Sequence, residues 1–392
     1  MANGDRTRIC FVTGTRAEFG LMRSTLLAIR AHPRLQLQIV ATGMHLDRAR
    51  GRSIDAIRAD GWQVDRVVAW DGKLGATRPG SARCTGSAMA GIAAALEELD
   101  SDVVLVVGDR VEAFAAAAAG HISGRVVAHV HGGDRAAGQV DDSLRHTITK
   151  LAHFHFPATA ESAERIAKLG EDPWRIRRVG SPGIDGIARE AAQRREVADE
   201  VGPLDWRRYV LLLQHPVDGD KTIERKRAEN LLEAVKAVPF RQIVIIYPNN
   251  DPGSRGIIEA WEGISTAAKD KRASLFITRP DVPRRVFLGL LRDAALLVGN
   301  SSSGIIEAAS FGTPVIDVGP RQKGREHGSN VMHVPYGGSR LCRALKSIWN
   351  DGRPRRYRAL NIYGSGGAGK RIATALAGLR IDERLLRKLI AY

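Results

Sequence analysis

Residues 294–307, Ala-Ala-Leu-Leu-Val-Gly-Asn-Ser-Ser-Ser-Gly-Ile-Ile-Glu, pass from an apolar run into a turn of small polar residues and back to apolar residues. This pattern predicts a buried strand, a turn and the first turn of a helix. Unpaired backbone N–H groups and the positive end of a helix dipole then meet at one point, which suits a phosphate or diphosphate. Four small residues would line that point: Ser301, Ser302, Ser303 and Gly304. Glu307 follows one turn later, where its carboxylate could accept hydrogen bonds from sugar hydroxyls. Taken alone, the segment fits an ordinary strand-to-helix turn with a serine N-cap equally well.

Short β-branched runs alternate with helical patterns along the whole chain, which predicts parallel sheets covered by helices. In the first half, strands are expected at 9–13, 37–41, 64–68, 103–107, 126–131, 154–157 and 176–179. In the second half they are expected at 210–213, 242–246, 275–278, 296–298, 314–318 and 332–334. The predicted fold class is α/β, with two doubly wound Rossmann-like domains and a ligand cleft between them at the carboxyl ends of the sheets.

The length of 392 residues exceeds what one hydrophobic core normally supports, so two domains are expected. The pattern breaks after Gly180-Ser-Pro-Gly183. We therefore expect four parts along the chain: an N-terminal domain at 1–185, a charged linker helix at 186–206, a second domain at 207–370 and a C-terminal helix at 371–392.

Composition and charge exclude some classes of protein and leave others open. No apolar run approaches the roughly 18 residues that span a bilayer, and the N-terminus lacks a signal-peptide pattern, so we expect a cytoplasmic protein with no membrane partner. Cys10, Cys84 and Cys342 lack CxxC spacing, which predicts neither a disulfide framework nor a zinc site. The net charge of +16 suits nucleic acid or small anions. Lysine and arginine are scattered and aromatic residues are only 5%, which is poor for base stacking, so charge alone does not decide.

Two polar clusters follow strands of the first half. Arg16 lies in Thr13-Gly-Thr-Arg-Ala-Glu-Phe-Gly20, which lacks the GxGxxG spacing of a dinucleotide site but offers a bidentate partner for phosphate. Asp109 lies in Gly108-Asp-Arg-Val-Glu112, at the carboxyl edge of the expected sheet. The alternatives are a surface arginine in a turn and a helix-capping aspartate.

The densest chemistry lies in His129-Val-His-Gly-Gly-Asp134 and the following segment Asp141-Asp-Ser-Leu-Arg-His-Thr-Ile-Thr-Lys150. Asp134 and Asp141 flank a glycine-bearing loop, and Arg145, His146 and Lys150 follow on one expected helix. Such grouping can keep one carboxylate protonated and another ionised, which acid–base catalysis requires. A metal set of His129, His131 and Asp134 is the alternative, although two histidines on one strand face can simply line a cleft. His153 and His155 are expected to be strand-edge or core histidines.

Three loops of the second half carry further candidates. His215 lies in Gln214-His-Pro-Val217, Asn249 in Pro248-Asn-Asn-Asp251, and Arg321 in Pro320-Arg-Gln-Lys-Gly-Arg-Glu-His327. Each of these residues could instead be an ordinary polar side chain of a solvated loop. Gly364-Ser-Gly-Gly-Ala-Gly-Lys370 approaches the P-loop pattern, but Arg371 occupies the position of the magnesium-binding hydroxyl, so this segment is expected to be a glycine-rich linker.

These motifs occur in an order that resembles the hydrolysing UDP-N-acetylglucosamine 2-epimerase family of sialic- and legionaminic-acid biosynthesis, and the likeness spans residues 8–375. The resemblance implies a glycosyltransferase-B-like fold whose last helix crosses back to the N-terminal domain. It places the sugar and the catalysis with residues 1–185 and the nucleotide with residues 207–370. It implies the reaction of UDP-N-acetylglucosamine with water to give N-acetylmannosamine and UDP, without metal, nicotinamide or other cofactor.

The resemblance also implies residue roles. The catalytic residues would be Asp109, Asp134, Asp141, His131 and His215. The residues around the diphosphate and the substrate would be Arg16, Arg110, His146, Ser301, Ser302, Ser303, Gly304 and Arg321. Glu307 would hold the ribose and Asn249 would lie near the nucleotide. Relatives suggest a homodimer or homotetramer whose only other partner is the UDP-sugar.

One departure from the family pattern leaves the acid and base unassigned. Many relatives carry Glu where Asp134 or His131 stands, so the roles stay open among Asp134, Asp141 and His131. The sugar is also open, since close relatives act on a 2,4-diacetamido-trideoxy sugar. Three further functions remain as alternatives: a non-hydrolysing epimerase that releases intact UDP-sugar, a glycosyltransferase that needs an acceptor, and a nucleic-acid-binding protein with salt-sensitive affinity.

Overall fold

The computed structural model describes residues 6–47, 52–69, 78–135, 140–249, 251–266 and 275–392. The chain forms two compact units. Unit 1 comprises Met1–Asp134, Val140–Asp185 and Tyr363–Tyr392, and unit 2 comprises Arg135–Gln139 and Gly186–Ile362. The chain therefore leaves unit 1 after Asp185 and contributes to it again from Tyr363 onward.

Unit 1 contains a six-stranded parallel sheet in the order β3-β2-β1-β4-β5-β6. Its strands are β1 (Thr7–Thr13), β2 (Leu35–Ala41), β3 (Arg66–Val67), β4 (Val103–Val107), β5 (Val126–Val130) and β6 (Phe154–Phe156). Its helices are α1 (Arg16–Ala31), α2 (Ser53–Ala59), α3 (Arg78–Glu98), α4 (Val111–Ile122), α5 (Asp141–Leu151), α6 (Ala160–Lys168), α14 (Ala368–Ala377) and α15 (Glu383–Leu386). The strand order is that of the Rossmann fold.

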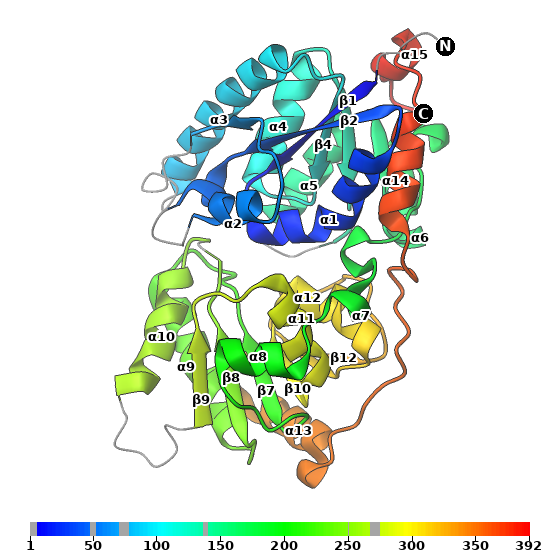
Figure 1. The fold of residues 1–392 in the computed structure, drawn as a ribbon. Helices are drawn as coiled ribbons and strands as arrows, with labels where there is room; N and C mark the ends of the chain where they lie inside the picture. The colour runs from blue at the N-terminus through cyan, green and yellow to red at the C-terminus, as the bar shows by residue number, and fades with distance from the viewer. Residues whose placement is uncertain (1–5, 48–51, 70–77, 136–139, 250, 267–274) are drawn as a thin grey trace. The chain divides into compact units, whose positions relative to one another are not determined.

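Alternating side chains of β1 enter two separate cores, one on each face of the sheet. Ile9 and Phe11 pack in the core that α1 and α14 cover, whereas Cys10 and Val12 pack in the core that α3 and α4 cover. Figure 1 shows α14, in red, running beside α1. Both faces of the central strand are thus buried, which explains the continuous apolar runs in the sequence.

Helix α1 illustrates how the sequence positions a loop at the sheet edge. Thr15 is its N-cap and forms a capping box with Glu18, whose carboxylate accepts the backbone N–H groups of Gly14 and Thr15. Apolar residues at helical spacing, including Met22, Leu26 and Ile29, are fully buried. The helix therefore starts directly after β1 and presents its first turn at the carboxyl end of that strand.

Unit 2 contains a second six-stranded parallel sheet, in the order β12-β11-β10-β7-β8-β9. Its strands are β7 (Tyr209–Leu213), β8 (Gln242–Ile246), β9 (Phe276–Arg279), β10 (Leu296–Gly299), β11 (Val315–Val318) and β12 (Val331–Val334). Its helices are α7 (Ile187–Glu190), α8 (Arg194–Val201), α9 (Lys221–Lys236), α10 (Ser254–Thr266), α11 (Arg284–Asp293), α12 (Ser302–Ile306) and α13 (Gly338–Trp349). Read from β9 to β12, the strands follow the order third, second, first, fourth, fifth, sixth, as in unit 1, so the prediction of two Rossmann-like domains is confirmed.

One expected strand is absent, and several strand ends, including that of β5, differ from expectation by one or two residues. Residues 176–179 do not form a strand: Ile176 makes an isolated bridge to His155, and Arg177 and Val179 donate backbone N–H groups to the carbonyls of His155 and Pro157. This segment lies along the edge of the sheet without a continuous ladder. Strand β5 ends at Val130 rather than at 131, because His131 adopts a left-handed backbone conformation with φ of 61°.

The glycine-rich segment before α14 is a linker into that helix, as the sequence indicated. Gly367 is the N-cap of α14. The carboxylate of Asp185 accepts the N–H groups of Ala368 at 3.0 Å and Gly369 at 2.7 Å. These N–H groups are therefore satisfied by a carboxylate of the chain itself.

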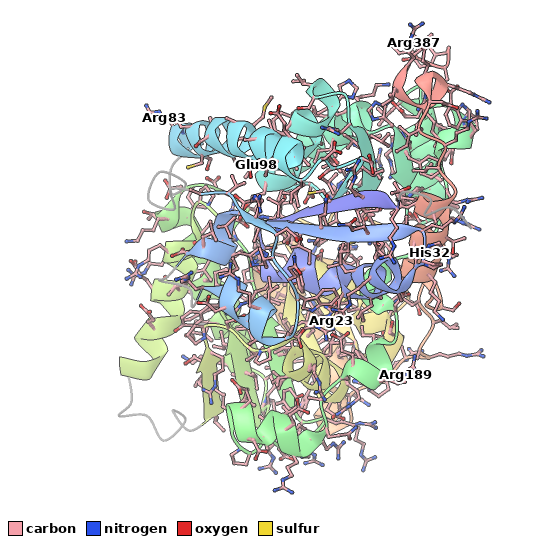
Figure 2. All side chains as sticks on the ribbon, turned by 45° about the horizontal axis from the view of Figure 1, so that its top comes forward. Arg23, His32, Arg83, Glu98, Arg189 and Arg387 are labelled. Carbon is pink, nitrogen blue, oxygen red and sulfur yellow. The ribbon has the colours of Figure 1, made fainter. Side chains whose placement is uncertain are left out.

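Positive charge is spread over many elements. Figure 2 labels Arg23 on α1, Arg83 on α3, Arg189 on α7 and Arg387 just after α15. None of the helices traced in the described ranges combines the length and apolar character that a membrane crossing requires.

Candidate active site

Candidate residues of both units follow the strands at which the strand order of the sheet reverses. In unit 1 the strand order reverses between β1 and β4, and in unit 2 between β7 and β10. Arg16 and Asp109 follow the first pair of strands, and His215 and Ser301 follow the second pair. Such switch points are where open α/β sheets bind ligands.

A buried ionic cluster occupies the switch point of unit 1. The guanidinium of Arg145, on α5, forms an ion pair with Asp109. Its Nη1 also donates to the carbonyl oxygen of His131 at 3.1 Å and lies 3.9 Å from Oδ2 of Asp134. Arg145 is 2% exposed, so one arginine joins the loops after β4 and β5 in a low-dielectric setting.

The loop from His131 to Asp134 is fixed by side-chain hydrogen bonds. His131 Nδ1 lies 3.0 Å from Asp134 Oδ2, and its Nε2 lies 2.9 Å from Ser181 Oγ. Ser162 Oγ donates to Asp134 Oδ1 at 2.8 Å. A Cβ at Gly133 would lie 2.2 Å from the Ser162 carbonyl oxygen, so only glycine lets the loop approach α6 this closely.

The three predicted catalytic carboxylates differ in exposure. Asp134 is almost fully buried, and its two oxygens contact Ser162 and His131. Asp109 keeps 22% of its side chain exposed beside Arg145. Asp141 is the first residue of α5 and is half-buried. Asp109 and Asp141 are therefore accessible to a bound molecule, whereas the carboxylate of Asp134 is hydrogen-bonded to neighbouring side chains. His146, one residue after Arg145, is also half-buried and lies 3.5 Å from Asp142.

Two arginines and two acidic residues occupy the segments after β1 and β4. Arg110 Nε is 3.2 Å from Glu112 Oε2, and Arg16 begins α1. The carboxyl of Glu18 has its pKa raised to about 7, first by burial and then by the nearby charge of Glu112. Sequence reasoning proposed the two arginines but not the two glutamates, because Glu18 reads simply as a capping residue.

The histidines of β5 and β6 are core residues. His129 Nε2 bonds the Gly108 carbonyl at 2.8 Å, and burial lowers the pKa of His129 to about 3. His153 and His155 are also buried. Throughout the described part of the chain, His, Cys, Asp and Glu side chains do not gather in threes that could bind a metal ion. Of the three residues considered as a metal set, His129 therefore lies in the core, whereas His131 and Asp134 belong to the ionic cluster.

In unit 2, His215 is held by its neighbours. Its backbone N–H donates to Asn300 Oδ1 at 2.7 Å, and Asn300 Nδ2 donates to the His215 carbonyl at 2.8 Å. The backbone N–H of Asn249 lies 3.4 Å from His215 Nδ1, which makes that nitrogen the acceptor. The neutral imidazole then carries its proton on Nε2. Asn250, in the same loop as Asn249, lies outside the described residues.

The stretch after β10 folds as the sequence predicts. Ser301 is the N-cap of α12, and its Oγ lies 2.9 Å from Ser303 Oγ. Ser302 is half-buried. Gly299 has φ of 136°, and a Cβ there would lie 1.9 Å from the Leu213 carbonyl oxygen, so β7 and β10 approach closely only with glycine. Gly304 packs α12 against Leu297 and Val315, which gives this glycine a packing role.

Two arginines organise the remaining candidates of unit 2. Arg321 Nη1 donates to the Asn300 carbonyl at 3.2 Å, next to the serine turn. Arg284 Nη1 donates to Glu307 Oε1 at 2.6 Å, and Arg284 Nε lies 3.3 Å from Glu190 Oε1. Glu307 is thus one arm of a Glu190–Arg284–Glu307 bridge between α7, α11 and the end of α12.

Sequence reasoning did not consider Arg284, and it named Arg145 only as a member of the polar segment 141–150. Arg145 stood in the densest motif, beside His146 and Lys150, and only the rotation of α5 shows which side chain faces Asp109. Arg284 is followed by Arg285, which is largely exposed and pairs with Glu196. Nothing in the sequence distinguishes these two adjacent arginines.

Comparison with known proteins gives a consistent result. A sequence family described as UDP-N-acetylglucosamine 2-epimerase matches residues 27–377. The chain is 35% identical to a Legionella pneumophila protein named UDP-N,N'-diacetylbacillosamine 2-epimerase (hydrolyzing), over 98% of this chain and 99% of that protein. It is 34% identical to a Neisseria meningitidis UDP-N-acetylglucosamine 2-epimerase, over 88% of each chain.

A solved structure shows the same fold. The crystal structure of UDP-GlcNAc 2-epimerase from Neisseria meningitidis bound to UDP-GlcNAc superimposes with a TM-score of 0.77, over 94% of this chain and 99% of that chain, at 18% sequence identity.

Proposed function

We propose, since the chain belongs to the UDP-N-acetylglucosamine 2-epimerase family, that it is a hydrolysing 2-epimerase. The substrate would be UDP-N-acetylglucosamine, and the products N-acetylmannosamine and UDP. The observation that carries this proposal is the ionic cluster of Asp109, Arg145, His131 and Asp134 at the switch point of unit 1. It supplies one partly exposed carboxylate, that of Asp109, beside fixed, buried partners, which proton transfer at a weakly acidic carbon requires.

The reaction has two stages. A carboxylate removes the proton from sugar C2, and the C1–O bond breaks so that UDP leaves with the bonding electrons. This gives a C1–C2 double bond. Water then supplies OH to C1, and a proton adds to C2 from the opposite face, which inverts that carbon. Atoms balance as UDP-sugar plus water giving free sugar plus UDP.

In this proposal Asp109 and Asp141 share the acid and base roles, because both keep exposed surface. Asp134 and His131 hold the loop after β5, and Arg145 orients Asp109. Arg16, Arg110 and His146 would contact the substrate. That one substrate is held by both units is a prediction of this proposal.

The leaving group would be stabilised by unit 2. Departing UDP gains negative charge, which N–H and hydroxyl donors and cations stabilise in a desolvated site. The hydroxyls of Ser301, Ser302 and Ser303, the guanidinium of Arg321 and the Nε2–H of His215 are suited to this role. Glu307 would accept the ribose hydroxyls, and Asn249 would lie near the base or ribose. No metal or organic cofactor enters any step.

A second sugar is supported by one finding. The Legionella relative, at 35% identity over nearly its whole length, is named for UDP-N,N'-diacetylbacillosamine, a 2,4-diacetamido sugar. The same chemistry at C2 and C1 would apply to that substrate. The product in either case would be a precursor for nonulosonic acids of the sialic type, and the homo-oligomeric state expected from the sequence stays a prediction.

The deciding experiment is proton NMR of the purified protein with each UDP-sugar in D₂O. Free UDP with a 2-deuterated manno-configured sugar from one of the two substrates would support the proposal and identify the sugar. Intact UDP-sugar with inverted C2 would instead indicate the non-hydrolysing reaction. No change with either substrate would overturn the proposal and favour a glycosyltransferase.

A further inference from the structure

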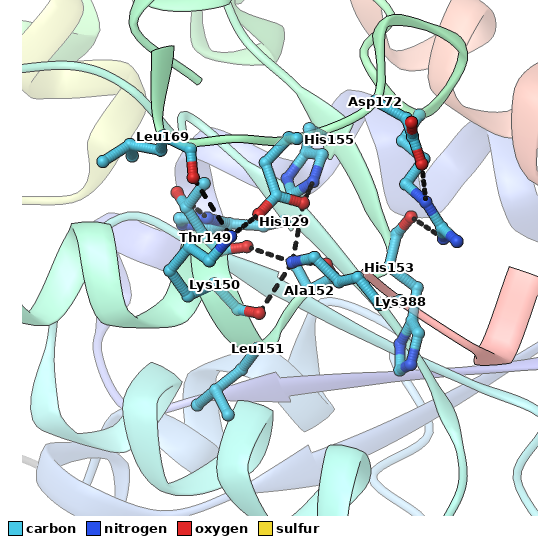
Figure 3. A network of polar contacts seen from close by, with 12 residues as sticks. His129, Thr149, Lys150, Leu151, Ala152, His153, His155, Leu169, Asp172 and Lys388 are labelled. Atoms are coloured by element: carbon cyan, nitrogen blue, oxygen red, sulfur yellow. Dashed lines mark hydrogen bonds and ion pairs between the residues drawn. The ribbon is translucent and has the colours of Figure 1, made fainter. Parts of the chain in front are cut away.

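The C-terminal segment of the chain reaches the end of helix α5. Figure 3 shows Lys388 extending toward the carbonyl groups that close α5 and toward the side chains of Lys150 and His155. Lys388 Nζ donates to the carbonyls of Thr149 at 3.0 Å, Lys150 at 2.6 Å and Ala152 at 2.6 Å. These are carbonyls that a helix end leaves without intrahelical partners, and a cation there also complements the helix dipole.

A buried carboxylate joins this lysine to α5. Glu171 Oε2 lies 2.7 Å from Lys388 Nζ, and Glu171 Oε1 lies 2.7 Å from Lys150 Nζ. His155 Nε2 lies 2.9 Å from Glu171 Oε2. Burial alone would raise the pKa of Glu171, but the hydrogen bonds from His155, Lys150 and Lys388 lower it to about 2. The carboxylate is therefore ionised at neutral pH and binds two ammonium groups.

The rest of the C-terminal segment is held by a second cation. Arg175, which is buried, donates to the carbonyls of Leu385 at 2.7 Å, Arg384 at 2.8 Å and Arg387 at 3.1 Å. It also donates to the His153 carbonyl at 3.1 Å. The segment that precedes Lys388 is therefore itself fixed to unit 1 through its backbone carbonyls.

We infer that Lys388 is a positioning residue of the candidate active site, because it fixes the C-terminal end of the helix that carries Asp141 and Arg145. Helix α5 has 11 residues, and isolated helices shorter than about 12–15 residues are marginal in water. The positions of Asp141 and Arg145 therefore depend on the contacts that fix the two ends of α5. Arg145 and Lys150 lie five residues apart, which is about 140° around the helix, so one helix faces Asp109 on one side and Glu171 on another.

This inference rests on the proposed function only through its activity readout. The test compares the full-length wild type with Lys388→Met, Lys388→Arg and Glu171→Gln. A matched control is Lys168→Met, which removes an exposed lysine that pairs with Glu164 on α6. For each protein, kcat and KM are measured with the UDP-sugar that the wild type turns over, and hydrogen exchange is measured for α5 peptides covering 141–151.

Lys388→Met should lower kcat by about 10- to 100-fold with KM changed by less than about 3-fold, since misplacement of catalytic groups by about 1 Å can cost about 10² in rate. Exchange of α5 amides should rise by about tenfold or more. Lys388→Arg keeps the charge and should stay within about 3-fold of wild type in both measurements. Glu171→Gln should shift both in the direction of Lys388→Met, and the Lys168→Met control should shift neither.

Wild-type kcat and wild-type α5 exchange in Lys388→Met would overturn the inference, even if the melting temperature fell. If the wild type turns over neither UDP-sugar, the proposed function fails, and the exchange comparison alone still decides whether Lys388 fixes α5. If Lys388→Met does not fold, Glu171→Gln carries the same comparison against the wild type and the Lys168→Met control, and wild-type kcat and α5 exchange in Glu171→Gln would then overturn the inference.

Discussion

Units 1 and 2 share one strand order but place opposite kinds of chemistry at the same topological position. At the switch point of unit 1, Asp109, Asp134 and Arg145 form a buried ionic cluster. At that of unit 2, Ser301 provides a hydroxyl group, and the uncharged amide of Asn300 fixes the backbone of His215. The topology thus determines where a site lies, and the loop residues determine what it does.

The difference has a physical reason. Proton transfer needs a carboxylate that is held in a fixed position, and the buried guanidinium of Arg145 holds Asp109 in this way. Stabilising a departing diphosphate needs preorganised donors, which uncharged groups provide without the desolvation cost of buried carboxylates. If this division is right, substitutions in unit 1 should change turnover, and substitutions in unit 2 should change nucleotide affinity.

The largest expected effect is that of Asp109→Asn. The amide cannot take a proton from sugar C2, so kcat should fall by about 10³-fold. The dissociation constant for UDP, measured by calorimetry, should stay within about 3-fold of wild type, because UDP is assigned to unit 2. Near-normal turnover would remove Asp109 from the mechanism, and a large loss of UDP affinity would break the division between the units.

Arg145→Lys should be nearly as damaging. A lysine ammonium cannot reproduce the planar fork that bonds both Asp109 and the His131 carbonyl, so kcat should fall by about 10²-fold. The free energy of unfolding, from urea titration, should fall by about 2–3 kcal/mol, because buried polar groups lose partners. A variant with kcat within about 3-fold of wild type would show that the cluster tolerates any cation.

In unit 2, Arg284→Met should mainly weaken nucleotide binding. Without Arg284, Glu307 loses the partner that fixes one of its carboxylate oxygens. The dissociation constant for UDP should rise by about tenfold, which is about 1.4 kcal/mol. Arg285→Met is the matched control, since Arg285 is adjacent, largely exposed and paired with Glu196. Equal effects of the two substitutions would contradict the bridging role of Arg284.

The last prediction concerns pH and unit 1 alone. Burial and the charge of Glu112 raise the pKa of Glu18 to about 7 from an ordinary value of 4.5. Between these values the folded chain binds the Glu18 proton more tightly than the unfolded chain does, so this group makes stability fall as pH rises.

Glu18→Gln removes that contribution. Its free energy of unfolding should decline less than that of the wild type between pH 5 and pH 8, by up to about 2 kcal/mol. Urea midpoints at the two pH values measure this difference. Parallel pH dependences in the two proteins would show that the Glu18 carboxyl is not perturbed in this way.

Much of the fold was predictable, because buried parallel strands require continuous apolar runs such as Val103–Val107. The polar residues after those runs were predictable for the same reason: parallel strands deliver their carboxyl ends to one edge. Asp109, His131 and Asp134 are indeed brought together, although 22 to 25 residues separate the last two from the first.

What escaped prediction depends on long-range geometry. The rotation of α5 selects Arg145 for the site and turns Lys150 to Glu171, and a helical pattern gives no absolute direction. The left-handed conformation of His131 ends β5 one residue early, although a non-glycine residue is uncommon there. Residues 176–179 have strand propensity but lie at the sheet edge, where only an isolated bridge forms.

The interrupted order of unit 1 along the chain has a consequence for synthesis. Helices α14 and α15 belong to unit 1, yet the ribosome makes them only after the whole of Gly186–Ile362. At roughly 5–20 residues per second, nascent unit 1 waits on the order of ten seconds for its last helices, with the apolar face that α14 covers still open to solvent. Unit 2, nearly continuous in the chain, can fold during that wait. Recruitment of a chaperone to the nascent chain is therefore expected to depend on unit 1.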